Sequence, residues 1–319
     1  MKILITGVSG FIGFSLAKKL LEKGNHVIGI DNINNYYSTE LKKKRIKQIK
    51  KFRNFKFYKI DINDKKKLKK ISSFKFEYIF HFAAQPGVRY SLINPSIYYH
   101  TNVLGFQNVF DAINYKNLKK AFYASSSSVY GDQKKFPIKE NFKLNAKNPY
   151  GMSKIINENL AELFSYKYKI PFIGLRLFTV YGEWGRPDMF ILKLLKHLNE
   201  KKIFNLNNSG YHFRDFTYIE DVTEICNRLM KKKFKTQNNI YNLCANDYVD
   251  IHNLKEKILI NFPQRKKYIK NVAANKADVF KTHGSNSEII KVLGKYKFKK
   301  INYGLKKTIE WFLKNSSII

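Results

Sequence analysis

The chain has 319 residues, of which 44% are hydrophobic and 15% aromatic, so it can bury a sizeable core and is not a disordered protein. Its 60 Lys and Arg residues outnumber its 24 Asp and Glu residues, which gives a formal net charge of +36. The two cysteines, Cys226 and Cys244, exclude a disulfide scaffold and are too few for a zinc or iron–sulfur site, so no metal is expected.

The basic residues are spread along the whole chain among Asn and Ile residues, rather than gathered in one arm or stripe. Their main clusters are the lysines at residues 42–44, 65–67 and 231–233. No zinc-finger motif or RNA-binding aromatic motif accompanies them, so we expect no specific nucleic-acid partner. A positive surface would still attract an anionic substrate.

The sequence contains no apolar run of about 18 residues, so no membrane insertion is expected. The first apolar run is short and turns at Gly7, and it lacks the long apolar stretch and cleavage site of a signal peptide. These features predict a cytoplasmic protein.

The first half of the chain alternates short apolar runs with segments of helical periodicity. Strands are expected at residues 2–6, 27–30, 55–60, 78–83, 121–125 and 172–177, and helices at residues 11–23, 41–51, 95–114 and 150–168. Alternation of apolar strands with helices predicts a parallel sheet that is covered on both faces. The expected fold class is therefore α/β, with a Rossmann-type doubly wound sheet.

Beyond about residue 178 the alternation loosens, and loops rich in Gly, Asn and Pro separate the elements. One more strand is expected at residues 239–243, and helices at residues 189–201, 221–232, 251–262 and 303–313. We predict an NAD-binding domain of residues 1–177 with about 217–245. Residues 178–216 and 246–319 are expected to form a smaller, mostly C-terminal α/β lobe that binds the substrate.

A glycine-rich turn lies between the first strand and the first helix. Gly7, Gly10 and Gly13 permit a tight turn, close approach of a pyrophosphate and packing of the helix on the strand. The start of the helix adds free N–H groups and a partial positive charge. Asp31 follows about 20 residues later, where a carboxylate binds the adenosine ribose and repels a 2′-phosphate. The pattern predicts an NAD site; a plain turn and a capping Asp31 are the alternatives.

Four serines, residues 125–128, end the fifth strand, where ligands of such sheets lie in the crevice above the strands. Further on, Tyr150 and Lys154 are spaced four residues apart and share a helix face. A neighbouring ammonium ion and an oxidised nicotinamide both favour the phenolate form of a tyrosine. Such a phenolate would be a base at neutral pH. Together with the glycine turn, this pattern predicts a redox active site.

These motifs resemble those of the extended short-chain dehydrogenase/reductases that act on nucleotide sugars, over essentially the whole chain. Within that family the chain is most similar to the UDP-glucuronate 4-epimerases. The segments that support this are residues 31–37, 81–91, 124–131, 178–182, 185–189 and 214–219. The resemblance implies an isomerase that converts UDP-glucuronate to UDP-galacturonate through a transient 4-keto sugar, with NAD as cofactor, for polysaccharide biosynthesis.

The resemblance also implies the site residues. Tyr150 would take the proton of the sugar 4-hydroxyl, Ser126 would hydrogen-bond the 4-oxygen, and Lys154 would lower the pKa of Tyr150 and hold the nicotinamide ribose. The expected cofactor-binding residues are Gly7, Gly10, Phe11, Ile12, Gly13, Asp31, Asn32, Asp61, Ile62, Ala83, Asn102, Tyr150 and Lys154. The expected substrate-binding residues are Arg89, Ser127, Ser128, Thr179, Arg186 and Arg214.

Arginine suits a uronate because its planar fork holds a carboxylate in two parallel hydrogen bonds. Arg186 is the first choice for this clamp and Arg89 the second, whereas Arg214 resembles the family's diphosphate-binding arginine. Ser127 and Ser128 stand where dehydrating or decarboxylating relatives carry acidic residues, which favours simple epimerisation.

Other features leave alternatives open. The motif Tyr-Gly-Met-Ser-Lys at residues 150–154 is closer to general sugar epimerases, and residues 273–278 depart from the Pro-Gly-Asp usual near the uridine side. A neutral UDP-hexose, UDP-glucose or UDP-N-acetylglucosamine, is therefore an alternative substrate, and a non-catalytic NAD-binding protein is a further alternative. The resemblance also implies a homodimer formed by two long helices, for which residues 95–114 and 150–168 are the candidates.

Overall fold

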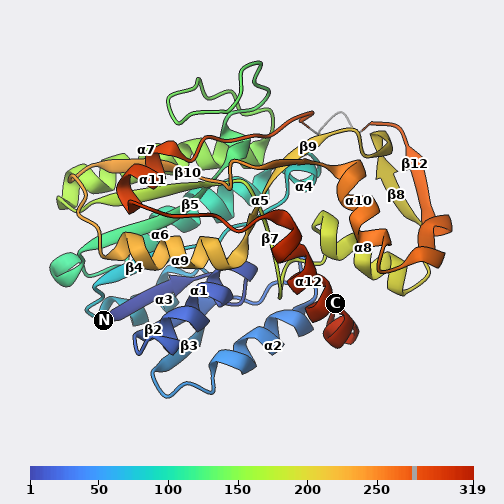
Figure 1. Ribbon diagram of the computed structural model, residues 1–319. Helices are drawn as coiled ribbons and strands as arrows, with labels where there is room; N and C mark the ends of the chain where they lie inside the picture. Colours follow the sequence, from blue (N-terminus) through green and yellow to red (C-terminus); the bar gives the residue numbers. More distant parts are fainter. Residues whose placement is uncertain (275–278) are drawn as a thin grey trace.

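The computed structural model describes residues 1–274 and 279–319 (Figure 1). Its centre is a seven-stranded sheet in which every strand is parallel to its neighbours. In spatial order the strands are β10 (Asn238–Leu243), β6 (Phe172–Leu177), β5 (Lys120–Ser126), β4 (Tyr78–His81), β1 (Lys2–Thr6), β2 (His26–Asp31) and β3 (Phe55–Lys59). The chain builds outward from β1 to β3 and then continues on the other side of β1 with β4. This reversal confirms the predicted Rossmann-type doubly wound fold.

Helices cover both faces of this sheet because alternate residues of its apolar strands point to opposite sides. Ile3 and Ile5 belong to a core shared with α1 (Phe11–Glu22), α2 (Thr39–Ile49) and α9 (Ile219–Met230). Leu4 points the other way, into a core shared with α3 (Lys65–Ser72), α6 (Gly105–Asp111) and α7 (Pro149–Tyr168). Figure 1 shows α1 and α9 side by side across one of these faces.

Helix α3 was not expected, because its sequence is dominated by lysine. The side chain of Asp64 caps it by accepting a hydrogen bond from the backbone N–H of Lys67 at 3.0 Å. Only Leu68 and Ile71, three positions apart, are buried. Two apolar residues are enough to attach a short helix to the sheet, but they are too few to be recognised as a periodic pattern.

The single helix expected at residues 95–114 is interrupted. The structure has α5 (Ser96–Tyr98), then a π-helical stretch (Tyr99–Leu104), and only then α6. Asn102 lies in the widened stretch, is fully buried and bonds to both backbone groups of Gln85 and to the Ser153 hydroxyl. The polar side chain thus ties the loop after β4 to α7, a contact that a regular amphipathic helix pattern does not predict.

Two smaller sheets complete the described fold. One contains β11 (Tyr248–Asp250), β9 (Phe213–Tyr218) and β7 (Thr179–Tyr181), and the other contains β12 (Ile269–Val272) and β8 (Phe204–Asn207). The remaining α-helices are α4 (Val88–Ile93), α8 (Phe190–Asn199), α10 (Ile251–Leu259), α11 (Ser287–Leu293) and α12 (Ile301–Asn315). In Figure 1, α8, α10, β8 and β12 lie together beyond one end of the large sheet. The division into two domains near residue 177 stays a prediction.

None of the helices within residues 1–274 and 279–319 combines the length and the apolar character needed to cross a membrane.

Candidate active site

A cavity of about 630 Å³ lies at the carboxyl ends of the large sheet's strands. Its lining comes from the glycine turn after β1, the end of β2, the loop after β4, the serines that end β5 and the first turns of α7. Residues from the loop after β6 and from β9 close it. This is the crevice in which doubly wound folds bind their ligands.

The glycine turn fits a dinucleotide because the backbone there leaves no room for side chains. Gly7 adopts φ +69°, and its N–H donates to the carbonyl of Ile30 at 2.9 Å. A Cβ added to Gly7 would lie 2.6 Å from the backbone nitrogen of Ala83, and one added to Gly13 would lie 2.3 Å from the carbonyl oxygen of Gly7. Gly10, Phe11, Ile12 and Gly13 line the cavity, so the start of α1 borders it and can receive a pyrophosphate.

Asp31 caps the turn and also lines the cavity, where its ribose-binding role stays a prediction. Its carboxylate accepts hydrogen bonds from the backbone N–H groups of Ser9, at 3.0 Å, and Ile33, at 2.7 Å, and so stabilises the turn. The same residue lines the cavity. A carboxylate has about four acceptor positions, which leaves capacity for ribose hydroxyls.

The other predicted cofactor residues divide into two groups. Asn32, Ile62 and Ala83 line the cavity. Asp61 and Asn102 are absent from its lining: Asp61 accepts a hydrogen bond from the Asn32 side chain at 2.8 Å, and Asn102 bonds inside the core. Their contacts orient neighbouring segments of the cavity wall.

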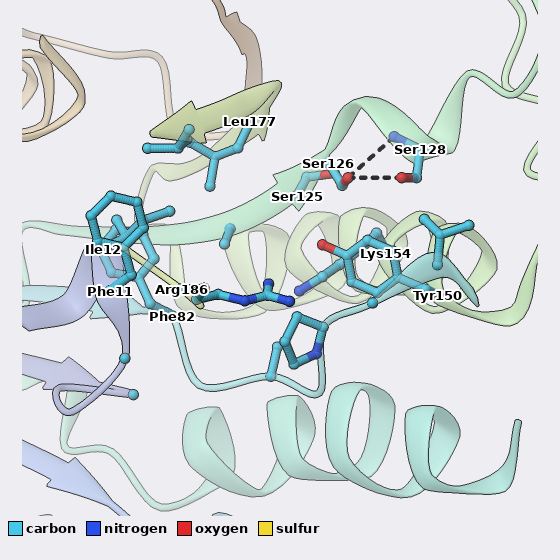
Figure 2. Close-up of a pocket in the computed structure, with 18 of the residues that line it drawn as sticks. Phe11, Ile12, Phe82, Ser125, Ser126, Ser128, Tyr150, Lys154, Leu177 and Arg186 are labelled. Carbon is cyan, nitrogen blue, oxygen red and sulfur yellow. Dashed lines mark hydrogen bonds between the residues drawn. The ribbon is translucent and has the colours of Figure 1, made fainter. Parts of the chain in front are cut away.

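The three predicted catalytic side chains extend into the same space, as Figure 2 shows. Helix α7 begins with Pro149 in its first turn, and the side chain of Asn148 caps it by accepting from the N–H of Gly151 at 2.8 Å. This start places Tyr150 in the first turn and Lys154 one turn later. Opposite them, the Ser126 hydroxyl accepts from the N–H of Ser128 at 3.1 Å and donates to its hydroxyl at 3.2 Å.

Burial is the largest influence on the pKa values of Tyr150 and Lys154. It raises the pKa of Tyr150, although a hydrogen bond with Ser126 and the charge of Arg186 act in the opposite direction. Burial lowers the pKa of Lys154 to about 8, against the influence of Glu158. Ser126 and Arg186 thus favour the Tyr150 phenolate, and the amine of Lys154 lies 5.9 Å from the tyrosine ring centre.

All but one of the predicted substrate residues belong to the same cavity. Ser127, Ser128, Thr179, Arg186 and Arg214 line it. Arg186 forms a two-pronged ion pair with Asp188, in which Nε donates to Oδ1 at 3.0 Å and Nη2 contacts Oδ2. The exception is Arg89, which is exposed on α4 and is absent from the lining.

Two basic residues of α2 that the sequence did not single out are connected to the cavity: Lys42 lines it and Arg45 supports its wall. Lys42 lines the cavity, donates to the carbonyl of Asn34 at 2.7 Å, and has a pKa lowered to about 8 by burial. Arg45 is fully buried and donates to the carbonyls of Ser9 and Gly185, each at 2.9 Å. It therefore links the glycine turn to the loop that precedes Arg186.

The helical spacing of Lys42 and Arg45 indicates that both side chains are buried. They lie among the buried positions of α2, which are Leu41, Lys42, Arg45, Ile46 and Ile49. A basic side chain on the apolar face of a helix has to be satisfied inside the protein, which distinguishes it from solvated lysines.

Among residues 1–274 and 279–319, no group of three or more His, Cys, Asp or Glu side chains is arranged to hold a metal ion. Most of the segment that departs from the family pattern near the uridine side, residues 275–278, lies outside the described residues.

Comparison with known proteins agrees with this geometry. A UDP-glucuronate 4-epimerase from Thermodesulfobacterium geofontis is 35% identical over 99% of this chain and 97% of its own length. Protein CapI from Staphylococcus aureus is 44% identical over 73% of this chain and 70% of that protein. The crystal structure of UDP-glucuronic acid 4-epimerase from Bacillus cereus, in complex with UDP-glucuronic acid and NAD, has a TM-score of 0.91 at 28% identity and covers 98% of this chain and 99% of that one.

The family model agrees with both findings. A model of the NAD dependent epimerase/dehydratase family matches residues 3–244, a span that contains the glycine turn, Asp31, the serines and the Tyr150–Lys154 pair. The cofactor is NAD, and the glycine cradle and Asp31 fit it. With its fold, its cavity and its relatives in agreement, the chain belongs to the NAD-dependent epimerase/dehydratase family.

Proposed function

We propose that this NAD-dependent epimerase, an isomerase, interconverts UDP-glucuronate and UDP-galacturonate, for polysaccharide biosynthesis. One observation supports the uronate above all others: Arg186 lines the same cavity as Ser126 and Tyr150. Arg186 is also close enough to Tyr150 for its charge to lower the pKa of the phenol. An arginine at this position can exchange its Asp188 partner for the carboxylate of a substrate. The names of the full-length relatives support the same substrate.

When bound, NAD would accept the hydride that leaves C4 of the sugar and return it to the opposite face of the ring. Tyr150 takes the proton of the 4-hydroxyl and returns it after the sugar has turned, so that the 4-oxygen ends on the opposite face of the ring. Ser126 holds the 4-oxygen by a hydrogen bond throughout, with Ser128 as its neighbour. Lys154 binds the nicotinamide ribose, and Arg214 binds the diphosphate.

A carboxylate clamp would also protect the intermediate. The 4-keto uronate is a β-keto acid, which loses carbon dioxide when the carboxylate bond aligns with the carbonyl π system. Arg186 can hold the carboxylate out of that alignment by two parallel hydrogen bonds. Ser127 and Ser128 offer no acid for a second proton transfer, so epimerisation is the expected outcome.

The experiment is to incubate purified protein separately with UDP-glucuronate, UDP-glucose and UDP-N-acetylglucosamine and to identify each product by nuclear magnetic resonance. UDP-galacturonate should form from UDP-glucuronate, without release of carbon dioxide. Activity confined to the neutral sugars would refute the uronate assignment and leave the epimerase chemistry in place. No turnover of any sugar would favour a non-catalytic NAD-binding protein.

A cytoplasmic homodimer completes the proposal. Leu163 and Tyr166, three positions apart on α7, are both exposed. Two apolar side chains on one outward face of a long helix favour pairing with a second copy. Sedimentation of the purified protein tests this, and a monomer at micromolar concentration would contradict it.

A further inference from the structure

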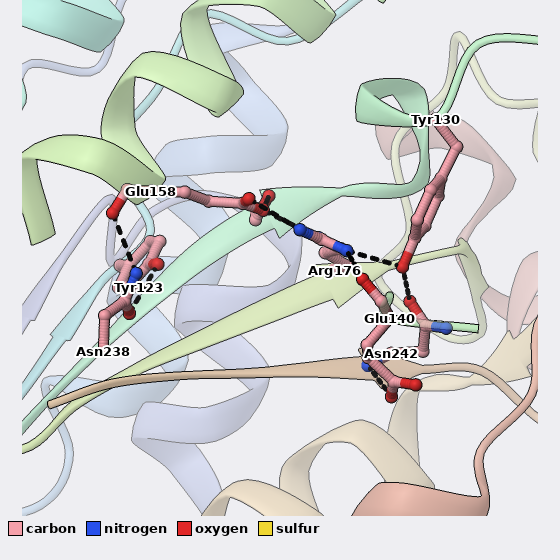
Figure 3. Close-up of polar contacts among 8 residues, drawn as sticks. Tyr123, Tyr130, Glu140, Glu158, Arg176, Asn238 and Asn242 are labelled. Atoms are coloured by element: carbon pink, nitrogen blue, oxygen red, sulfur yellow. Dashed lines mark hydrogen bonds and ion pairs between the residues drawn. The ribbon is translucent and has the colours of Figure 1, made fainter. Parts of the chain in front are cut away.

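A buried ion pair connects the catalytic helix to the large sheet (Figure 3). Glu158 on α7 is 4% exposed and Arg176 on β6 is 3% exposed. The Arg176 Nε donates to Glu158 Oε1 and the Nη2 to Oε2, both at 2.8 Å, so the contact is bidentate. Because Glu158 lies one turn after Lys154 and two turns after Tyr150, the pair fixes the helix that carries both catalytic side chains.

The same ion pair holds both ends of the serine segment, residues 125–130. At its start, the Ser125 hydroxyl donates to Glu158 Oε1 at 2.6 Å. At its end, the Tyr130 hydroxyl accepts from Arg176 Nη1 at 2.8 Å and donates to the side chain of Asn242 at 2.6 Å. Ser126, Ser127 and Ser128 lie between these two anchors, and Ser125 stands beside Arg176 in the parallel register of β5 and β6.

We propose that the Glu158–Arg176 pair is a positioning device that holds the serine segment against Tyr150, so that Ser126 and Ser128 meet the sugar 4-oxygen. The inference rests on the role of Ser126 in the proposed epimerase reaction. It extends that role to residues that line no part of the cavity themselves: Glu158, Arg176 and Tyr130.

Further contacts of Arg176 extend the device to the next segment of chain. Its Nη1 also donates to the carbonyl of Glu140 at 2.9 Å, and the carboxylate of Glu140 accepts from the N–H of Asn242 at 2.8 Å. The Asn242 side chain donates in turn to the carbonyl of Ile138 at 2.9 Å. The segment after the serines is therefore fastened to β10 by the same group of side chains.

Stability alone gives a weak reason for such a pair. Removing two charges from water offsets most of the attraction between them, and apolar side chains of similar volume are often as stabilising. Apolar packing does not fix the orientation of a side chain, whereas the guanidinium fork fixes both the distance and the plane of the carboxylate that it binds. This directional hold suits a segment whose hydroxyls must meet a reacting atom.

The test compares two tyrosines that differ in their contact with Arg176. Tyr123 and Tyr130 are both fully buried, and each hydroxyl donates to the Oδ1 of an asparagine, Asn238 or Asn242. Only the Tyr130 hydroxyl also accepts a hydrogen bond from Arg176. Tyr130→Phe and Tyr123→Phe should therefore lose similar stability, whereas only Tyr130→Phe should release the end of the serine segment.

We expect Tyr130→Phe to lower kcat about 10-fold with KM and NAD content unchanged, since small misplacements of reacting groups cost up to about 100-fold. Tyr123→Phe should stay within about twofold of wild type in kcat, as expected for a residue remote from the reacting groups. The substrate is whichever UDP-sugar the wild-type protein turns over, so the test does not depend on the uronate assignment. The rate at which bound NAD is reduced should fall in parallel with kcat.

A second pair of variants keeps the proposal testable if a tyrosine variant fails to fold. Ser125→Ala removes one hydrogen bond to Glu158, whereas Ser165→Ala removes one hydrogen bond to a backbone carbonyl from an equally buried serine of α7. Only Ser125→Ala should lower kcat, and because Ser125 itself lines the cavity, the positioning role also requires that KM and NAD content stay unchanged. Equal kcat within both matched pairs would overturn the inference alone, whereas a wild-type protein inactive on every sugar would overturn the proposed function and this inference with it.

Discussion

The residues that line the cavity form two predicted parts, a cofactor end and a substrate end, which are built in different ways. The cofactor end comes from the short stretch that contains Gly7, Gly10 and Gly13, together with Asp31, whose carboxylate binds backbone N–H groups. The substrate end consists of side chains such as Ser126, Tyr150 and Arg186 from segments far apart in the sequence. The cofactor end thus requires that no side chains stand at the glycine positions, whereas the substrate end requires particular side-chain functional groups.

This difference predicts opposite vulnerabilities. An added methyl group should damage the cofactor end, because the backbone there is already in close contact. Removal of a hydroxyl or a charge should damage the substrate end, because its function depends on proton transfer and ion pairing. The four experiments below test this contrast, beginning with the largest expected effect.

Tyr150→Phe should remove the group that accepts the 4-hydroxyl proton. We expect kcat to fall about 1,000-fold, within the range for loss of a general base. NAD should stay bound, because the glycine cradle and Asp31 are unchanged. Tyr166→Phe, an exposed position on the same helix, is the control and should keep full activity. Turnover of Tyr150→Phe at the wild-type rate would exclude the proposed role.

Gly13→Ala should damage the cofactor end. Its Cβ would lie 2.3 Å from the carbonyl oxygen of Gly7, so the turn has to shift. We expect NAD affinity to fall about 100-fold, as for a strained site of about 3 kcal/mol. Gly24→Ala is the control: with φ +76° it should lose about 1 kcal/mol of stability, but its Cβ meets nothing within 4 Å. Calorimetric titration with NAD should separate the two variants, and equal affinities would refute the cradle.

Arg186→Gln should act on substrate choice. The variant loses a charged, bidentate contact, so we expect KM for UDP-glucuronate to rise about 10- to 100-fold, corresponding to about 1.5–3 kcal/mol. KM for a neutral UDP-hexose should change little. Arg228→Gln, which breaks a surface pair with Glu224, should alter neither value. A similar rise for charged and neutral sugars would show that Arg186 does not recognise the carboxylate.

His81, at the end of β4, should make the core beneath the cofactor end sensitive to acid. Burial lowers its pKa to about 3, and the charge of Lys154 adds to the effect. Because the folded-state value lies below the ordinary value of about 6.5, the unfolded chain binds more protons between these limits. Stability should therefore be fully present above pH 6.5 and decline as the pH falls toward 3.

Urea unfolding at pH 7 and pH 5 measures this effect. Wild-type protein should lose about 2 kcal/mol between these conditions through His81 alone, at about 1.4 kcal/mol per pH unit. His81→Asn should lose correspondingly less. His26→Asn, at an exposed position on β2, should behave as wild type. The same pH dependence in His81→Asn as in wild type would contradict the assignment.

Much of the fold could be predicted because its signals are local. The strands expected at residues 2–6 and 172–177 coincide with β1 and β6, and glycines and apolar runs marked the turn and sheet around them. The strands of the two smaller sheets were missed, and two of them, β7 and β11, have only three residues each. Segments of that length contain too few positions to show an alternating pattern.

The candidate site could be predicted to a similar extent. Most of the predicted cofactor and substrate residues line the cavity, whereas Asp61, Asn102 and Arg89 do not. The roles of all these residues stay predictions. Lys42 and Arg45 were missed because composition alone explained their charge, although their place among the buried residues of α2 distinguishes them from solvated lysines.

The sequence by itself determined the seven strands of the large sheet, the glycine turn and the helical spacing of Tyr150 and Lys154. Each depends on backbone geometry within a few residues, where side-chain size and periodicity are decisive. Only the tertiary structure decided that Arg45 reaches Gly185, 140 residues away, and that Glu158 meets Arg176 and Ser125. Those contacts depend on how distant segments pack, because the local pattern can indicate that a charged side chain is buried but does not show which distant group it meets.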